Sequence, residues 1–209
     1  MKMDQLVAWK EEYYDELPFM VDDYHRLTME HFVWSNARGF QGRVLEVGAE
    51  FKKPYIPDCV LLNQDNPAKA QWTWSNKPPT VASPSVIADV MSLCFRDDSF
   101  DMVIATETLE HVRRPWVAMA EIYRVLKPGG IMLQTAPFMW PYHGCQRYSD
   151  YWRFSADGWR ELCYSFRSCL VYPVLFSSMD VVNQLDKIED MGDRENVRYA
   201  TAYMVKAIK

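Results

Sequence analysis

Residues 100–135 read FDMVIATETLEHVRRPWVAMAEIYRVLKPGGIMLQT, and this stretch decides the fold. It holds two short apolar runs, Phe100–Ala105 and Gly130–Thr135, typical of strands buried on both faces of a parallel sheet. Between them, four apolar residues recur at the spacing of one helical face: Met119, Ile122, Tyr123 and Leu126. Lys-Pro-Gly-Gly at 127–130 then ends the helix and turns into the second strand. The stretch predicts a strand–helix–strand unit with parallel strands.

Similar elements lie on both sides of this unit. Further strand-like runs are predicted at Arg43–Val47, Val60–Leu62, Val86–Val90, Cys169–Phe176 and Ala200–Ile208. Ser155 is placed to cap a helix over Ala156–Phe166, and residues 1–40 have the pattern of about two helices broken near Pro18. Strands that alternate with helices indicate a three-layer, Rossmann-like α/β fold. We expect a single domain over residues 1–209, with a helical lid at 1–40 and the core at 41–209.

Composition narrows the class of protein. The chain has 209 residues, a formal charge of −5 and no basic run longer than a pair, so a nucleic-acid partner is not expected. Its five cysteines lack paired-ligand spacing and are predicted to be free thiols in a reducing compartment. The N-terminus has no apolar signal region, and no run approaches the ~20 apolar residues that span a bilayer. We expect a cytoplasmic protein without a metal site, because the four histidines are scattered along the sequence.

Polar residues follow the predicted strands, where ligands bind in open α/β sheets. After the first strand come Glu46 and Gly48, and the glycine lets the backbone turn tightly and approach a ligand. The second strand leads to Asp65, which can accept both hydroxyls of a ribose. The third leads to Asp89, which can accept an exocyclic amine such as that of adenine, or can simply cap a turn.

Several of these features, taken in order, resemble the class I S-adenosylmethionine-dependent methyltransferases. The resemblance covers roughly residues 40–170 and rests on VLEVG after Arg43, Asp89, Phe95, DSFD at 98–101, LEH at 109–111 and RVLKPGG at 124–130. It implies a seven-stranded sheet whose last strand, Ala200–Ile208, is antiparallel, and S-adenosylmethionine as cofactor with S-adenosylhomocysteine as product. It also implies positions around that cofactor: Glu46 and Gly48 at the methionine moiety, Asp65 at the ribose, Asp89 and Val90 at the adenine, and Thr106 below the sulfonium.

The sequence departs from the family at Glu50, where glycine is usual. The eight residues Phe51–Asp58 include two prolines, so we predict a short loop where the family places a helix. The Glu50 carboxylate could attract the sulfonium or the ammonium of the cofactor. The alternative is that it points into solvent.

The acceptor is expected to meet the segment APFMWPYHGCQRYSDYWRFSADGWREL at 136–162. His143 is the first candidate for a general base, and His111 is the second. His143 could instead be a structural histidine bonded to Asp150 or to backbone. Five residues are candidates for holding the acceptor: Tyr142, Arg147, Tyr151, Trp152 and Arg153. Their alternatives are packing within the loop and, for Arg153, a salt bridge to Asp150.

The resemblance, together with these residues, implies an S-adenosylmethionine-dependent methyltransferase that acts on an oxygen of a small polar molecule, a sugar or a glycan precursor. Family members with a similar PYH and DYWRF segment often act on such acceptors. Two alternatives stay open: a cofactor-binding sensor that does not turn over, and a nicotinamide-dependent reductase. A reductase would call for a fuller glycine-rich turn that opens a long helix. The sequence indicates no oligomeric state.

Overall fold

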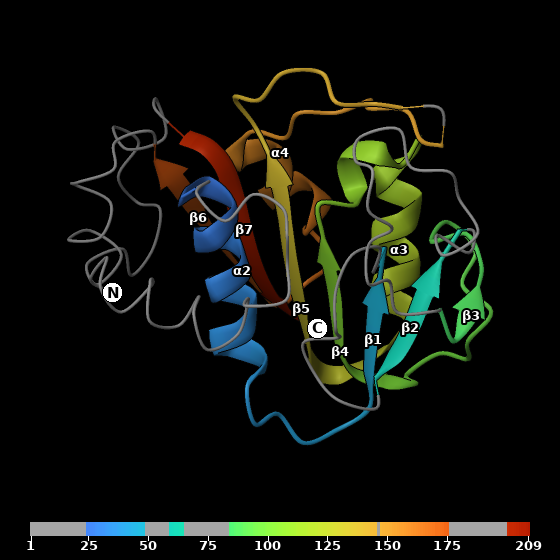
Figure 1. Cartoon of the computed structure of the whole chain (residues 1–209). Helices are drawn as coiled ribbons and strands as arrows, with labels where there is room; N and C mark the ends of the chain where they lie inside the picture. The colour runs from blue at the N-terminus through green and yellow to red at the C-terminus, as the bar shows by residue number, and fades with distance from the viewer. Residues whose placement is uncertain (1–23, 49–58, 65–83, 146, 176–199) are drawn as a thin grey trace.

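The computed structural model describes residues 24–48, 59–64, 84–145, 147–175 and 200–209. Within these residues the chain forms one sheet of seven strands, in the order β3-β2-β1-β4-β5-β7-β6 (Figure 1). The strands are β1 Val44–Val47, β2 Val60–Asn63, β3 Val86–Ile87, β4 Phe100–Thr106, β5 Leu126–Pro137, β6 Ser168–Leu175 and β7 Ala200–Ile208. The helices are α2 Tyr24–Ala37, η2 Leu109–His111, α3 Pro115–Val125 and α4 Ala156–Leu162.

The direction of the strands confirms the predicted fold. β3, β2, β1, β4 and β5 pair in parallel, and β7 pairs antiparallel with both β5 and β6. From β1 the chain proceeds outward through β2 and β3, then returns to place β4 on the other side of β1. The strand order therefore reverses between β1 and β4. Open α/β sheets bind their ligands beyond the carboxyl ends of the strands at such a reversal.

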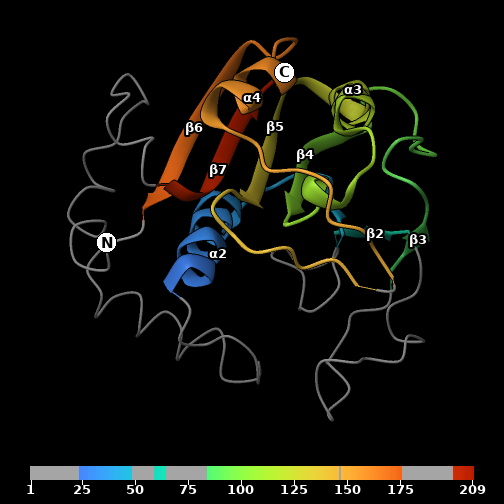
Figure 2. The ribbon, with the colours of Figure 1, turned by 90° about the horizontal axis from the view of Figure 1, so that it is seen from above.

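One face of the sheet packs against α3 and α4, and the other packs against α2 (Figure 2). Successive residues of β4 alternate between these faces. Val103 and Ala105 belong to the core that includes Met119, Ile122 and Trp159, whereas Met102 and Ile104 belong to the core that includes Val33 and Ala37. All of these side chains are at most 2% exposed. Because both faces are covered, nearly every residue of β4 is apolar, which explains the continuous run in the sequence.

Local signals position the helices. Pro115 begins α3, where its missing N–H costs nothing because that group has no partner inside a helix. The Ser155 hydroxyl accepts a hydrogen bond from the Gly158 N–H and caps α4, as predicted. α4 ends at Leu162, earlier than the predicted Phe166, because the chain turns there to enter β6.

Two other boundaries differ from the prediction. β5 begins at Leu126 rather than Gly130, since the chain takes extended geometry immediately after α3 and Leu126 pairs with Phe100 of β4. Gly129 has φ +79° within this segment. β3 is shorter than predicted and spans only Val86–Ile87. The predicted helix before Pro18, the loop at 51–58 and the residues Glu50 and Asp65 lie outside the described residues.

The cysteines at positions 59, 94, 145, 163 and 169 are all free thiols, as predicted. Among the helices that the structure describes, none combines the length and apolar character needed to cross a bilayer.

Candidate active site

Gly48 forms a tight turn after β1, at the reversal in strand order. Its φ is +75°, and its N–H donates to the Leu62 carbonyl of β2 over 2.9 Å. The Thr108 side chain lies against it: the hydroxyl donates toward the carbonyls of Thr106 at 2.9 Å and Val47 at 3.3 Å. A Cβ atom at position 48 would overlap that hydroxyl and come within 3.1 Å of the Thr108 methyl carbon. Only glycine satisfies both the conformation and the close contact, so the loops after β1 and β4 meet here.

The other predicted cofactor residues follow neighbouring strands. Glu46 lies in β1, is 3% exposed, and accepts a long hydrogen bond from the Cys59 thiol at 3.9 Å. Asp89 lies in the turn after β3, where its Oδ1 accepts from the Met91 N–H at 2.8 Å. Val90 is buried within the core beside that turn, and Thr106 ends β4 half-buried. The structure thus places these four residues around the end of the sheet where the reversal occurs.

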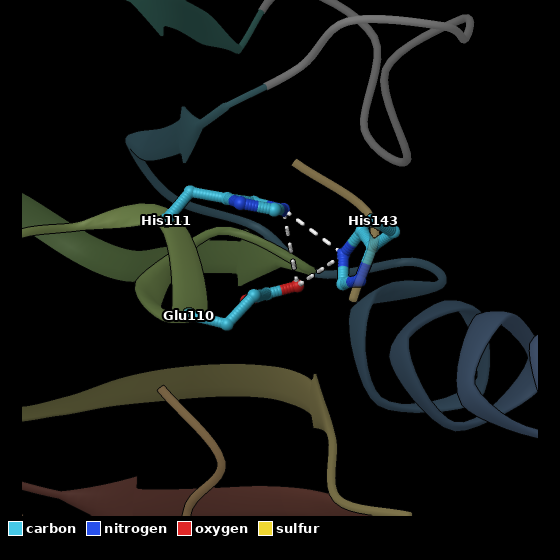
Figure 3. A group of neighbouring side chains, drawn as sticks. All are labelled: Glu110, His111 and His143. Carbon is cyan, nitrogen blue, oxygen red and sulfur yellow. Dashed lines mark hydrogen bonds and ion pairs between the residues drawn. The ribbon is translucent and has the colours of Figure 1, made fainter. Parts of the chain in front are cut away.

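Glu110, His111 and His143 converge at the carboxyl ends of β4 and β5 (Figure 3). Glu110 and His111 belong to η2, which follows β4, and His143 belongs to the segment that follows β5. The two Nε2 atoms lie 3.1 Å apart. Glu110 Oε1 lies 3.7 Å from Nε2 of His111 and 3.9 Å from Nε2 of His143. The Glu110 side chain is fully buried, whereas the imidazoles are 15% and 27% exposed.

Each imidazole is held through its other nitrogen. His111 Nδ1 lies 2.7 Å from the Ser149 carbonyl oxygen, which can only accept, so this nitrogen carries the proton. His143 Nδ1 lies 3.2 Å from Asp150 Oδ2 and 3.3 Å from the Pro141 carbonyl. The pKa of His111 is lowered mainly because burial disfavours the charged ring, although its bond to Ser149 opposes this shift.

Asp150 and Arg153 hold His143 in position. Burial by itself would raise the pKa of Asp150, but hydrogen bonds from Arg153 and from the His143 N–H lower that pKa to about 2. Asp150 is therefore a carboxylate that only accepts, and Nδ1 of His143 is its donor. Arg153 binds both Asp150 oxygens and also donates to the Pro141 carbonyl at 3.0 Å. The salt bridge foreseen as the alternative for Arg153 is present, and its guanidinium fixes the loop.

The residues proposed to hold the acceptor have different surroundings. Tyr142 is 73% exposed and Tyr151 is 49% exposed, and Trp140 and Met139 nearby are 40% and 56% exposed. Trp152, in contrast, packs against the core and donates its Nε1–H to the Val112 carbonyl at 2.9 Å. Arg147 is half-buried. Tyr142 and Tyr151 are thus available to a ligand, whereas Trp152 has the packing role that was its alternative.

Three residues at this site were not singled out from the sequence. Thr108 supports the Gly48 turn, and Glu110 joins the two histidines. Glu107 has φ +49°, an uncommon conformation for a residue with a side chain, and its N–H donates to the Thr135 carbonyl. The sequence signal for all three was the ETLEH run directly after a predicted strand, where site residues are expected.

Comparison with known proteins agrees with this geometry. Residues 51–134 match the family model described as a methyltransferase domain. The ubiquinone/menaquinone biosynthesis C-methyltransferase UbiE from Ruegeria sp. strain TM1040 is 37% identical over 70 residues, which cover 34% of this chain. The match spans 28% of the length of that relative, so this chain corresponds to only about a quarter of it.

Solved structures show the same fold over most of the chain. An S-adenosylmethionine-dependent methyltransferase from Mesorhizobium loti has a TM-score of 0.55 at 12% identity, covering 90% of this chain and 99% of that one. Phosphoethanolamine N-methyltransferase 2 from Haemonchus contortus has a TM-score of 0.52 at 12% identity, covering 100% of this chain and 58% of that one. It was solved with phosphomonomethylethanolamine and S-adenosylhomocysteine.

The sheet, the reversal between β1 and β4 and the glycine turn define a Rossmann-like fold with a nucleotide-type site. The antiparallel β7 and the match of residues 51–134 to a methyltransferase domain are features that this chain shares with the class I S-adenosylmethionine-dependent methyltransferases.

Proposed function

We propose that this protein transfers the methyl group of S-adenosylmethionine to an oxygen of a small polar acceptor, such as a sugar or a glycan precursor. The observation that carries the proposal is the position of the two histidines. They face each other at the ends of β4 and β5, beside the reversal at which this fold binds its cofactor. A partly exposed histidine in this place can receive a proton from an acceptor.

The residues at the reversal fit the proposed cofactor. The Gly48 turn lies at the carboxyl end of β1, and its positive φ and its close contact with Thr108 both call for a residue without a side chain. One oxygen of Asp89 is bound to the Met91 N–H, and the other can accept an amine of a purine. The buried Glu46 side chain lies two residues before the turn. When bound, S-adenosylmethionine supplies a methyl group already activated by its positive sulfur, so the protein needs chiefly to position the acceptor.

His143 has the geometry of a base for that acceptor. Its Nδ1–H faces Asp150, so its Nε2 carries the lone pair, and the side chain is 27% exposed. A hydroxyl is a weak nucleophile until its proton leaves, and a positioned base contributes typically ~10²–10⁴-fold to such a step. The exposed aromatic rings of Trp140, Tyr142 and Tyr151 offer apolar faces on which a sugar ring can rest.

Calorimetry on the purified protein tests the cofactor first. S-adenosylmethionine and S-adenosylhomocysteine should bind, and NAD should not; the reverse preference would favour the reductase alternative. Methyl release is then followed with a panel of sugars, nucleotide sugars and other small alcohols. Cofactor binding without release from any acceptor would favour the sensor alternative.

His143→Ala tests the base. We expect turnover to fall ~10²–10⁴-fold while the affinity for S-adenosylhomocysteine changes little. His31→Ala is the matched control, since His31 lies in α2 and is not part of the cluster of Glu110, His111 and His143. If His143→Ala turns over like the control, His143 takes no part in the reaction.

A further inference from the structure

The two Nε2 atoms of the histidine pair face each other, and in neutral rings neither of them carries a proton to donate. The Nδ1 atoms of His111 and His143 both lie against oxygens that accept, the Ser149 carbonyl and the Asp150 side chain, which Arg153 holds with two hydrogen bonds. In the neutral rings both protons therefore sit on Nδ1, and both Nε2 atoms carry lone pairs. These lone pairs lie 3.1 Å apart, beside the buried Glu110 carboxylate. Three electron-rich atoms at one point attract a cation.

The spacing of the three atoms suits a metal ion. The separations of 3.1, 3.7 and 3.9 Å define a triangle, and the circle through its corners has a radius of about 2.1 Å. Zinc–nitrogen bonds are about 2.0–2.1 Å and zinc–carboxylate bonds about 2.0–2.2 Å long. A single ion at the centre of the triangle would thus reach all three atoms without movement of the side chains.

We propose that Glu110, His111 and His143 form a binding site for one divalent transition-metal ion, such as Zn²⁺ or Fe²⁺. Two imidazoles and one carboxylate suit these ions, whereas Mg²⁺ prefers oxygen ligands. The expectation that the protein has no metal site rested on the distance between the histidines in the sequence. In the folded protein the two histidines are close in space, because β4 and β5 are adjacent strands and the segments that follow them lie together.

The groups around the ligands match those of a built metal site. Ligating histidines normally donate their second N–H to a carbonyl or a carboxylate, which fixes the ring and strengthens the ligand. His111 has the Ser149 carbonyl in this role, and His143 has Asp150, which Arg153 holds with two bonds. The partly exposed imidazoles also leave one side of the triangle open to a water molecule or to an acceptor oxygen.

The ion would alter the reaction proposed above. This effect on the reaction depends on the proposed function, whereas the metal site itself does not. A bound cation lowers the pKa of an oxygen that coordinates it, so an acceptor hydroxyl could release its proton to solvent. The Nε2 of His143 would then hold the ion and could not also take the proton. Removal of the metal with a chelator should consequently lower turnover if the ion acts, and leave it unchanged if His143 acts as the base.

Metal binding is tested without cofactor or acceptor, so its outcome does not depend on methyl transfer. The protein is stripped with a chelator, dialysed, and titrated with Zn²⁺ and separately with Mg²⁺ by calorimetry. We expect one equivalent of Zn²⁺ to bind and Mg²⁺ to bind far more weakly. Co²⁺ serves as a coloured probe, and its spectrum should lack the near-ultraviolet bands that thiolate ligands produce.

Variants locate the site. His143→Ala and Glu110→Gln should each abolish tight binding, and Asp150→Asn should weaken it by about 10–100-fold because it only supports His143. His31→Ala and Cys145→Ser are the matched controls and should bind like the parent protein. Because Glu110 is fully buried and its variant could misfold, the partly exposed His143 gives the decisive result. The proposal is overturned if the parent protein binds no equivalent of Zn²⁺. It is also overturned if the His143→Ala variant binds Zn²⁺ as tightly as the parent protein does.

Discussion

Gly48→Ala is the change that most directly tests how the site is built. The side chain at position 48 would have to adopt φ +75° and would overlap the Thr108 hydroxyl. Gly39 provides a matched control, because its φ is +70° but nothing lies within 4 Å of a Cβ placed there. The two variants therefore share the conformational cost of a left-handed residue, and only one of them meets a neighbour.

The magnitudes follow from this difference. The left-handed conformation costs roughly 1–2 kcal/mol for a residue with a side chain, so Gly39→Ala should lower the free energy of unfolding by about that amount. In Gly48→Ala the Thr108 side chain must also rotate, which breaks its hydrogen bonds to Thr106 and Val47. Each such bond contributes roughly 0.5–1.5 kcal/mol, so we expect a total loss of about 2–5 kcal/mol.

Urea unfolding, followed by far-ultraviolet circular dichroism, measures both losses. The double variant Gly48→Ala with Thr108→Ala completes a double-mutant cycle, since it removes the hydroxyl that the new methyl group overlaps. We expect the double variant to be more stable than the sum of the two single losses predicts. Equal losses for Gly48→Ala and Gly39→Ala, or strictly additive losses in the cycle, would refute the contact between the two loops.

Two further predictions concern the core and its charges. Trp159→Ala should lower the free energy of unfolding by about 3–5 kcal/mol, because this side chain is fully buried. Trp159→Phe should cost less, since it keeps most of the ring and removes a buried N–H that has no partner among the described residues; equal losses in urea unfolding would contradict this. Hydrogen bonds from Arg124 lower the pKa of Glu121 in the folded protein below its ordinary value of 4.5. The contribution of Glu121 to stability is therefore complete above pH 4.5 and is lost as the pH falls through the pKa of the folded state. The stability difference between the parent protein and Glu121→Gln, measured in urea at pH 7 and at about pH 3, should shrink at low pH, and a constant difference would contradict this.

Much of the fold could be predicted because its signals are local. The apolar run of β4 is continuous because helices cover both faces of the sheet, and burial therefore appears directly in the sequence. The Ser155 cap and the Pro115 start are set by hydrogen bonds within a few residues. Boundaries were less predictable where pairing with a neighbour decides them. Leu126 is in a strand because it pairs with Phe100, which lies 26 positions earlier.

The sequence by itself determined the class of fold and the turn at Gly48, and it predicted the region in which an acceptor would meet the protein. Only the tertiary structure decided which side chains meet there. His111 and His143 are 32 positions apart, yet their Nε2 atoms lie within 3.1 Å because β4 and β5 are neighbours in the sheet. Arg153 could have faced a ligand or Asp150, and two hydrogen bonds to a buried carboxylate determined the outcome. Such choices depend on distances between segments that fold onto one another, and a linear pattern of residue types does not contain those distances.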